Sequence, residues 1–253
     1  MSDISKIESW LNDSVETSDV DDEKPRLSYS KKIVAWLDIL GVRSKIKNEK
    51  KYDAEDIIGI MNSLATYVKN SCDRLYEDEK LDYSQIADGF MIVADITCAD
   101  EICKILAEIQ WKILLNLKML SRGAVTVGNV SVYNNDKFII GPAYVDAYAM
   151  ESENAVYART IVSNAFIDET KDYLTVSFLK EDSDKCVYID YIDYVIKYNY
   201  DDSLRTSKIL SQQGVIKELK KNYSPKTQDK KISVLQKYGW TIALLKRNKI
   251  DIK

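Results

Sequence analysis

Two stretches of sequence decide the fold: Ile33-Val34-Ala35-Trp36-Leu37-Asp38-Ile39-Leu40-Gly41 and Gln85-Ile86-Ala87-Asp88-Gly89-Phe90-Met91-Ile92-Val93. Each is an apolar run of strand character with one carboxylate, Asp38 at a strand end and Asp88 at a hairpin tip. A buried charge is costly unless it is compensated, and two acids at adjoining strand tips commonly share a cation. Two oxygen ligands that leave other positions open suit Mg²⁺ or Mn²⁺ beside substrate phosphates. Together the stretches predict the metal-binding floor of a nucleotide site.

Each aspartate also has an ordinary structural interpretation. Asp38 is consistent with capping the turn that follows a strand. The pair Asp88-Gly89 is common in the tight turns of β-hairpins. The metal interpretation therefore rests on the two aspartates taken together and on the spacing between them.

The amino-acid composition excludes several kinds of catalytic and binding site. The chain has 253 residues, enough for one domain with additions, and a net charge of -4 without a basic stripe for nucleic acid. It contains no histidine, which excludes Ser-His-Asp triads, Cys-His pairs and histidine-ligated zinc. The four cysteines lack paired spacing, no apolar run is long enough to span a bilayer and no signal peptide is evident, so we expect a cytoplasmic protein. Carboxylates, Lys, Arg, Tyr and metal remain, which favours phosphoryl chemistry.

Hydrophobic periodicity predicts an α+β fold. The order strand, helix, hairpin, helix, strand indicates an antiparallel-rich sheet with helices on one face. A hairpin turn is expected at Asp88-Gly89, another turn at 134–136, and a helix that begins with Pro142 in its first turn. Strands are expected at 31–38, 81–87, 90–94, 123–130, 137–140 and 159–163, and helices at 53–77, 99–119 and 142–152.

The chain divides into three parts. Residues 1–27 are acidic and polar, so we expect a mobile arm. Residues 28–172 carry the motifs and form the expected main domain. Residues 173–253 are expected to pack on that domain. This last part is expected to contain an extra strand at 186–198 and two amphipathic helices, at 203–222 and 227–248.

Four segments between residues 31 and 165 carry a resemblance to a known family. They are Trp36-Leu37-Asp38-Ile39-Leu40-Gly41, Ile86-Ala87-Asp88-Gly89-Phe90-Met91, Arg122-Gly123-Ala124-Val125-Thr126-Val127-Gly128, and Ile140-Gly141-Pro142-Ala143 with 147–152 and 159–163. The sequence resembles the class III nucleotidyl cyclases, most closely the pyrimidine cyclases of the bacterial anti-phage Pycsar systems. This resemblance implies a ferredoxin-like cyclase catalytic domain at 28–172 with a C-terminal helical extension. Past 172, only Lys237-Tyr238-Gly239-Trp240 resembles the tail of that branch.

The resemblance also implies roles for individual residues. Asp38 and Asp88 would bind two Mg²⁺ or Mn²⁺ ions, and the backbone carbonyl of Ile39 would be a third ligand. The reaction implied is in-line attack of the ribose 3′-hydroxyl on the α-phosphorus with release of pyrophosphate. Gly41 would permit close approach of the backbone to the triphosphate. The turn against the triphosphate would comprise Ile39, Leu40, Gly41, Val42 and Arg43.

Departures from the family pattern bear on the substrate. Purine-specific cyclases read the base with Lys and Asp or with Glu and Cys, and the matching positions here are Ser84 and Pro142. Neither residue can make those contacts, and leaving the polar groups of a purine unmet is costly. A pyrimidine triphosphate, UTP or CTP, is therefore expected. Tyr83, Ser84 and Gln85 are candidate base contacts, although alternating hairpin residues explain them equally well.

Another departure bears on catalysis. The family's transition-state Asn and Arg align with Val145 and Ala149, which cannot stabilise developing phosphate charge. Arg122 and Arg159 are the candidate replacements, together with Arg43 and Lys45 beside the phosphate loop. Solvated arginines at strand ends are the alternative interpretation of Arg122 and Arg159. An inactive nucleotide-binding regulator with a cyclase fold is the alternative to the enzyme.

The expected biological role follows from the resemblance alone. It implies a homodimer with two active sites at the interface, each drawing metals from one chain and base contacts from the other. Cyclic UMP or cyclic CMP would act as a second messenger in anti-phage defence. The effector would be reached through the cyclic nucleotide, so neither direct effector contact nor nucleic acid nor a membrane is an expected partner.

Overall fold

The structure is a computed structural model that describes residues 28–48, 50–78, 80–133, 138–200, 202–223 and 232–252. The arm predicted at 1–27 and the turn predicted at 134–136 lie outside the described residues. Within these ranges, no helix has the length and hydropathy needed to cross a bilayer.

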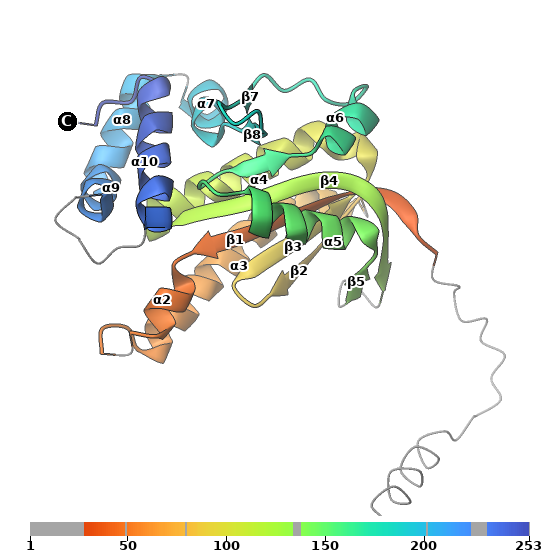
Figure 1. Ribbon diagram of the computed structural model, residues 1–253, viewed down its shortest axis with the longest axis horizontal. Coiled ribbons are helices and arrows are strands. Elements are labelled where there is room, and N and C mark those ends of the chain that lie inside the picture. The colour runs from red at the N-terminus through yellow and green to blue at the C-terminus, as the bar shows by residue number, and fades with distance from the viewer. Residues whose placement is uncertain are drawn as a thin grey trace, which may run out of the picture.

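A mostly antiparallel sheet forms the centre of the molecule (Figure 1). β1 (Ser30–Leu40) lies between β3 (Gly89–Ala94) and β4 (Leu120–Tyr133) and is antiparallel to both. β4 also pairs in parallel with β6 (Thr160–Val162). Three more strands belong to this sheet, β2 (Leu81–Ile86), β7 (Leu179–Glu181) and β8 (Val187–Ile189). The strand order among the described residues is β2-β3-β1-β4-β6-β8-β7, and β5 (Phe138–Ile140) pairs with the end of β4. The predicted α+β fold with an antiparallel-rich sheet is confirmed.

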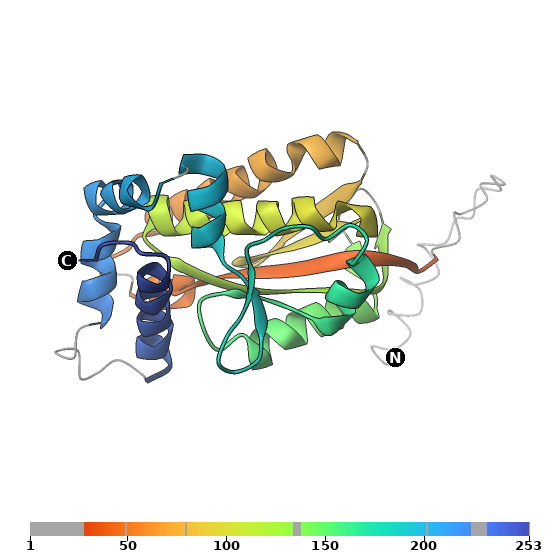
Figure 2. The same cartoon turned by 90° about the horizontal axis from the view of Figure 1, so that it is seen from above.

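One face of the sheet carries the main core. α3 (Ala54–Glu77) and α4 (Ala99–Lys112) lie on this face (Figure 2). The apolar spacing of the sequence predicts both helices, and α4 continues into a π-helical turn, η2 (Ile113–Leu117). From β1, this core takes the odd-numbered residues of the apolar run, Ile33, Ala35 and Leu37.

The opposite face is covered by α5 (Pro142–Ala149), which begins with Pro142 as predicted. From β1, Val34 and Trp36 point to this face and pack with α5 in a second cluster. The expectation that helices lie on one face is therefore wrong for α5, as Figure 2 shows. The reason is that the run 33–37 is apolar at every position, so β1 has two apolar faces and both require cover.

The β2–β3 hairpin turns one residue earlier than predicted. The last residue of β2 (Leu81–Ile86) pairs with Gly89, so Ala87 and Asp88 form the loop and Gly89 begins β3. Ala87 takes the left-handed conformation, with a φ of 55°. Glycine is needed at position 89 for packing, because a Cβ there would lie 2.7 Å from Cζ2 of Trp36. The shift leaves Asp88 at the tip of the hairpin.

The C-terminal part of the chain extends the sheet before it becomes helical. β8 (Val187–Ile189) pairs with β6, and β7 (Leu179–Glu181) pairs with β8. The strand predicted over 186–198 is correct only for β8, because α7 (Tyr191–Val195) follows at once. Asp190 ends the strand, since its side chain accepts hydrogen bonds from two backbone N–H groups in the first turn of α7.

Three helices lie in the described residues after 202, where the sequence predicts two. α8 (Ser203–Gln212) and α9 (Val215–Tyr223) replace the first predicted helix, and Gly214 between them has a φ of 71°, which breaks the helix. α10 (Ile232–Arg247) corresponds to the second. Figure 1 shows all three at the end of the sheet where β1 finishes, and the charge of Lys237 on α10 acts on Asp38.

Candidate functional site

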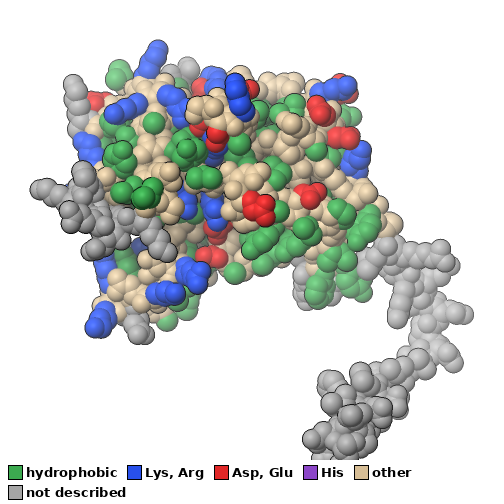
Figure 3. All heavy atoms as spheres, viewed as in Figure 1, with side chains coloured by type: hydrophobic (Ala, Val, Ile, Leu, Met, Phe, Trp, Pro, Cys, Tyr) green, Lys and Arg blue, Asp and Glu red, His purple; other side chains and the backbone are tan. Residues whose placement is uncertain are grey.

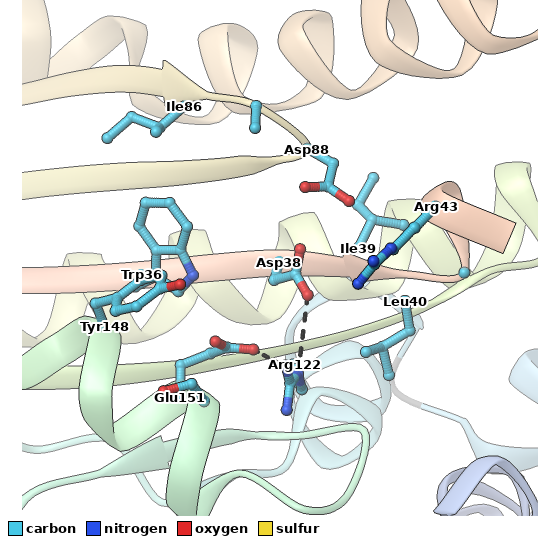
Figure 4. Close-up of a pocket in the computed structure, with 13 residues that line it drawn as sticks. Trp36, Asp38, Ile39, Leu40, Arg43, Ile86, Asp88, Arg122, Tyr148 and Glu151 are labelled. Carbon is cyan, nitrogen blue, oxygen red and sulfur yellow. Dashed lines mark ion pairs between the residues drawn. The ribbon is translucent and has the colours of Figure 1, made fainter. Parts of the chain in front are cut away.

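Strand pairing brings the two aspartates to one end of the sheet. Asp38 lies near the end of β1, opposite Gly89 of β3 and Arg122 of β4. Paired residues of antiparallel strands point to the same face, so Asp38 and Arg122 lie side by side on the face that α5 covers. Asp88 precedes Gly89 at the hairpin tip, and Figure 4 shows its carboxylate and that of Asp38 pointing into a shared space.

A pocket of about 440 Å³ opens between the hairpin tip, the end of β1 and α5. This volume is in the range of small-molecule sites. Seven of the residues singled out from the sequence line it: Asp38, Ile39, Leu40, Gly41, Arg43, Asp88 and Arg122. Six others complete the lining: Trp36, Ile86, Ala87, Tyr148, Glu151 and Ser152.

The environment of Asp38 disfavours its charge. Burial first and the Asp88 carboxylate second raise the pKa of Asp38 from 3.8 to about 6, against the opposing effects of Arg122 and Lys237. Two acids that face each other in a partly desolvated pocket are stabilised by a cation placed between them. A cation between Asp38 and Asp88 would lower the electrostatic cost of ionising Asp38.

Arg122 is held between two acids. Its Nε lies 3.8 Å from Oδ2 of Asp38 and forms an ion pair with Oε1 of Glu151 on its other side. Glu151 belongs to the π-helical turn η3 (Met150–Asn154) that continues α5, and only 3% of its surface is exposed. Burial raises the pKa of Glu151 to about 7, although Arg122 acts in the opposite direction. Glu151 thus fixes the guanidinium beside the aspartates.

Sequence reasoning gave Glu151 no role of its own. The available signal was a carboxylate near the end of a predicted helix, which is more often a solvated position. The pairing with Arg122 arises only because η3 folds over the end of β4.

Lys237 supplies a second cation from the far end of the chain. It lies on α10, and its charge interacts with Arg122, Asp38 and Glu151. Burial first, and then the neighbouring Arg122, lower the pKa of Lys237. The sequence marked the run 237–240 only as a tail motif, and no local pattern indicated that it reaches the site.

The loop after β1 owes its shape to Gly41. This glycine has a φ of 100°, and its carbonyl accepts hydrogen bonds from the N–H groups of Ser44 and Lys45 at 3.1 Å, which begins the short helix α2 (Val42–Ile46). A Cβ at Gly41 would meet nothing within 4 Å, so the glycine is required for its backbone conformation. The side chain of Val42 is buried in the main core, and Arg43 lines the pocket.

An aromatic wall closes the other end of the pocket. The rings of Trp36 and Tyr148 meet edge to face, with centroids 5.5 Å apart. Trp36 is buried, whereas half of the surface of Tyr148 is exposed. Neither residue was a site candidate from the sequence, where helical spacing favours packing for Tyr148.

Arg159 does not belong to this pocket. Its side chain is fully buried, and its guanidinium donates hydrogen bonds to Asp182 at 2.7 Å and to Asp184. The rings of Tyr157 and Trp240 lie against it, at 5.0 and 5.8 Å from Cζ. The expectation of a catalytic role for Arg159 is therefore corrected: the residue holds β6, the β7–β8 turn and α10 together.

The candidate base contacts on β2 do not line the pocket either. The ring of Tyr83 packs against Tyr76 of α3, with centroids 5.7 Å apart, on the opposite face of the sheet. Ser84 pairs with Met91 and so shares the face of the pocket, but it lies beyond the pocket rim. Gln85 is exposed and reaches back to the carbonyl of Ala87.

The donor set of the pocket fits a divalent cation with open coordination positions. No group of three or more His, Cys, Asp and Glu side chains forms a closed metal site within the described ranges. Asp38 and Asp88 are hard oxygen donors that share one space, and Ile39 lines the same pocket. A site with few protein ligands suits Mg²⁺ or Mn²⁺ that is also held by substrate phosphates.

No family model and no curated protein matches the sequence. Solved structures do match. The guanylyl cyclase domain of the RhoGC fusion protein from the aquatic fungus Blastocladiella emersonii is 17% identical, with a TM-score of 0.50 over 64% of this chain and 94% of that one. The adenylyl cyclase CyaB from P. aeruginosa is 16% identical, with a TM-score of 0.48 over 64% of this chain and 94% of that one.

A bacterial light-regulated adenylyl cyclase is 13% identical, with a TM-score of 0.48 over 73% of this chain. This chain spans only 56% of the length of that protein. Sequence identities of 13% to 17% support a shared fold, and they do not establish a shared activity. The strand order, the position of the aspartate pair and the likeness to the RhoGC domain lead to one conclusion: the chain has the α+β fold of a class III nucleotidyl cyclase domain.

Proposed function

We propose that the protein is a nucleotidyl cyclase that converts UTP or CTP to the 3′,5′-cyclic monophosphate and pyrophosphate. The observation that carries the proposal is the pair Asp38 and Asp88, whose carboxylates face a shared space beside Arg122. In the reaction, the ribose 3′-oxygen forms a bond to the α-phosphorus and loses its proton to solvent. The bond from the α-phosphorus to the bridging oxygen breaks, and pyrophosphate leaves.

The residues of the pocket would have different roles in this reaction. Asp38 and Asp88 would hold two Mg²⁺ or Mn²⁺ ions, which supply Lewis acidity toward the 3′-hydroxyl and the leaving pyrophosphate. Arg122 would present positive charge to the phosphates, and Glu151 would keep its guanidinium in position. Arg43, on the loop after Gly41, would contact the triphosphate.

The absence of polar purine-reading side chains at the base-reading positions favours a pyrimidine base. By the family resemblance, Ser84 and Pro142 stand where purine cyclases carry their polar readers. A purine bound against them would leave its donors and acceptors unmet. The half-exposed ring of Tyr148 at the edge of the pocket offers a surface on which a single-ring base can stack.

A second copy of the chain is the proposed partner. Exposed apolar side chains lie at the pocket, on α5 and on β5, and Figure 3 shows apolar side chains gathered over α5 and β5. Contiguous exposed apolar surface of this kind marks interaction sites. The residues are Ile86, Phe138, Ile140, Val145 and Tyr148, with exposed fractions between 36% and 58%. A role of the cyclic nucleotide in anti-phage defence is proposed from the family resemblance alone.

Four parallel incubations test the reaction. Purified protein with Mn²⁺ and one ribonucleoside triphosphate each should release pyrophosphate with UTP or CTP only, and chromatography should identify the cyclic product. Asp38→Asn should abolish the release while the circular dichroism spectrum stays unchanged. Product from ATP or GTP alone would overturn the pyrimidine assignment.

One observation favours a second candidate, a nucleotide-binding regulator without turnover. Val145 and Ala149 occupy the positions where the family resemblance requires the transition-state Asn and Arg. The same incubations separate the two functions. Binding of UTP or CTP without pyrophosphate release would support the regulator.

A further inference from the structure

A second cavity lies on the other side of the Gly41 loop. Its volume is about 660 Å³, and it is bounded by α2, the segment between η2 and β4, α9 and α10. It shares only Leu40 and Gly41 with the pocket that contains the aspartates. Its polar lining is made mainly of lysines and amides: Lys45, Lys51, Lys118, Lys221, Asn48 and Asn222, with Ser44, Tyr52, Tyr238 and one acid, Glu218.

The lysines of this cavity carry an excess of positive charge. The Nζ atoms of Lys45 and Lys51 both lie over the ring of Tyr52, at 4.1 and 5.2 Å from its centroid. Their charges and hydrogen bonds lower the pKa of the Tyr52 hydroxyl. Lys221 pairs with Glu218, at 3.3 Å from Oε2. Four cations therefore face a single carboxylate.

Ion pairs within the fold do not account for the position of these lysines around one cavity. No ion pair joins Lys45, Lys51 or Lys118 to a carboxylate within the described part of the chain. Like charges that converge on a cavity repel each other, so their free energy is lowered by an anion bound between them. The chain as a whole is acidic, with a net charge of -4, which makes this local excess of positive charge more specific.

We propose that the cavity binds the phosphate groups of a small polyphosphate ligand, at a site separate from the aspartate pocket. Lysine ammonium groups and side-chain amides are the donors that phosphate oxygens accept from. The volume suits a small molecule rather than a polymer. The ligand is either a nucleoside triphosphate or a short inorganic polyphosphate, and both present the same chemistry to the lysines.

Because the cavity lies between the Gly41 loop and the C-terminal helices, a bound ligand would contact both. Lys45 and Lys51 follow the Gly41 loop, whereas Lys221 lies on α9. A polyanion held by both groups ties the loop beside the aspartate pocket to the C-terminal helices. Occupancy of the second cavity would therefore order the loop that carries Arg43.

Calorimetric titration with inorganic tripolyphosphate in EDTA tests the proposal on the full chain. Without metal, binding depends on the lysines and does not require turnover, so the result is independent of the proposed cyclase activity. One molecule is expected to bind per chain, and the affinity should fall as salt rises. The Lys51→Gln/Lys221→Gln double variant should weaken binding about tenfold or more.

Two matched variants provide the controls. Lys217→Gln changes an exposed lysine on α9 that lines a different hollow, so binding should not change. Asp38→Asn should also bind as the wild type does, because the aspartate pocket is not involved. No binding to the wild type, or equal weakening by Lys217→Gln, would overturn the proposal. Binding that survives in the double variant but is lost in Arg43→Gln would place the anion in the aspartate pocket and overturn it too.

Chemical modification of the wild type avoids any doubt about folding of the variants. Tripolyphosphate should protect Lys51 and Lys221 from acetylation at least several-fold, as read by mass spectrometry, and should leave Lys217 reactive. Equal protection of all three would contradict a defined site. The same protection readout with UTP and uridine then identifies the ligand source: stronger protection of Lys51 and Lys221 by UTP than by tripolyphosphate indicates a nucleotide, and equal protection indicates the polyphosphate alone.

Discussion

The Nε atom of Arg122 lies 3.8 Å from Oδ2 of Asp38 and forms an ion pair with Glu151 on its other side. One guanidinium therefore serves two acids, one from β1 and one from η3. It does not neutralise them fully, because the pKa values of Asp38 and Glu151 remain raised, to about 6 and about 7. The metal-free site is electrostatically strained, and its behaviour with pH and substitution can be predicted.

The metal-free protein should become less stable as the pH rises from about 4 to about 7. Both acids have higher pKa values in the folded state than their ordinary values of 3.8 and 4.5. In this window the folded state binds more protons than the unfolded state, so the free energy of unfolding falls as they ionise. The stabilisation is fully present below the lower values and is lost above the raised ones.

Denaturant unfolding in EDTA between about pH 5 and about pH 7.5 measures this effect. Asp38→Asn should flatten the slope and stabilise the metal-free protein near neutral pH by about 1–3 kcal/mol. Divalent cation should stabilise the wild type and not the variant. A wild-type curve that is flat or rises over this window would contradict the prediction.

Arg122→Gln should lower turnover about 100- to 1000-fold, the range measured for loss of one preorganised charge-stabilising donor. It leaves Asp38 and Glu151 facing each other without their shared cation, so their pKa values should rise further. Arg122→Lys keeps the charge and should retain more activity than Arg122→Gln. Initial rates of pyrophosphate release measure both, and a wild-type rate in Arg122→Gln would remove Arg122 from the candidate catalytic residues.

Gly89→Ala should destabilise the fold by about 1–3 kcal/mol, because the new Cβ would lie 2.7 Å from Cζ2 of Trp36 and 3.0 Å from the carbonyl oxygen of Leu37. It should also move the hairpin tip that carries Asp88 and lower activity. The control is Gly59→Ala in α3, where a Cβ meets nothing within 4 Å. That change should stabilise the protein by up to about 1 kcal/mol. Thermal unfolding compares them, and equal effects would show that Gly89 is not needed for packing.

Arg159→Met should cost about 3 kcal/mol or more, because it leaves Asp182 and Asp184 without the buried guanidinium that they share. Since Arg159 lies outside the pocket, turnover per folded molecule should stay near the wild-type value. Denaturant unfolding gives the stability, and rates at low temperature are normalised to the folded fraction. Loss of turnover in fully folded protein would restore Arg159 as a catalytic candidate.

Lys237→Gln should weaken nucleotide binding several-fold and raise the pKa of Asp38, because α10 then no longer contributes a cation to the site. The control is Lys246→Gln, an exposed position on the same helix that should leave both properties unchanged. Titration with UTP at several pH values measures the affinity and its pH midpoint. Identical behaviour of the two variants would show that α10 covers the site without acting on it.

The sequence predicted the elements around the site because their signals are local. The apolar run of β1, the helical spacing of α3 and α4, and Pro142 at the start of α5 are each encoded in neighbouring residues. Predictions were less accurate where a single side chain redirects the backbone. Asp190 caps α7 inside a stretch of strand character, and Gly89, expected in the hairpin turn, begins β3 where it packs against Trp36.

The sequence by itself determined that two carboxylates, at 38 and 88, end apolar strand segments, since alternation and turn chemistry are properties of adjacent residues. Only the tertiary structure decided which charges surround them. Glu151 and Lys237 reach Arg122 through the fold of η3 and α10, while Arg159, equally plausible as a sequence candidate, is enclosed by Asp182 and Asp184. The electrostatic energy of such groups depends on distance and burial in space, which no local pattern encodes.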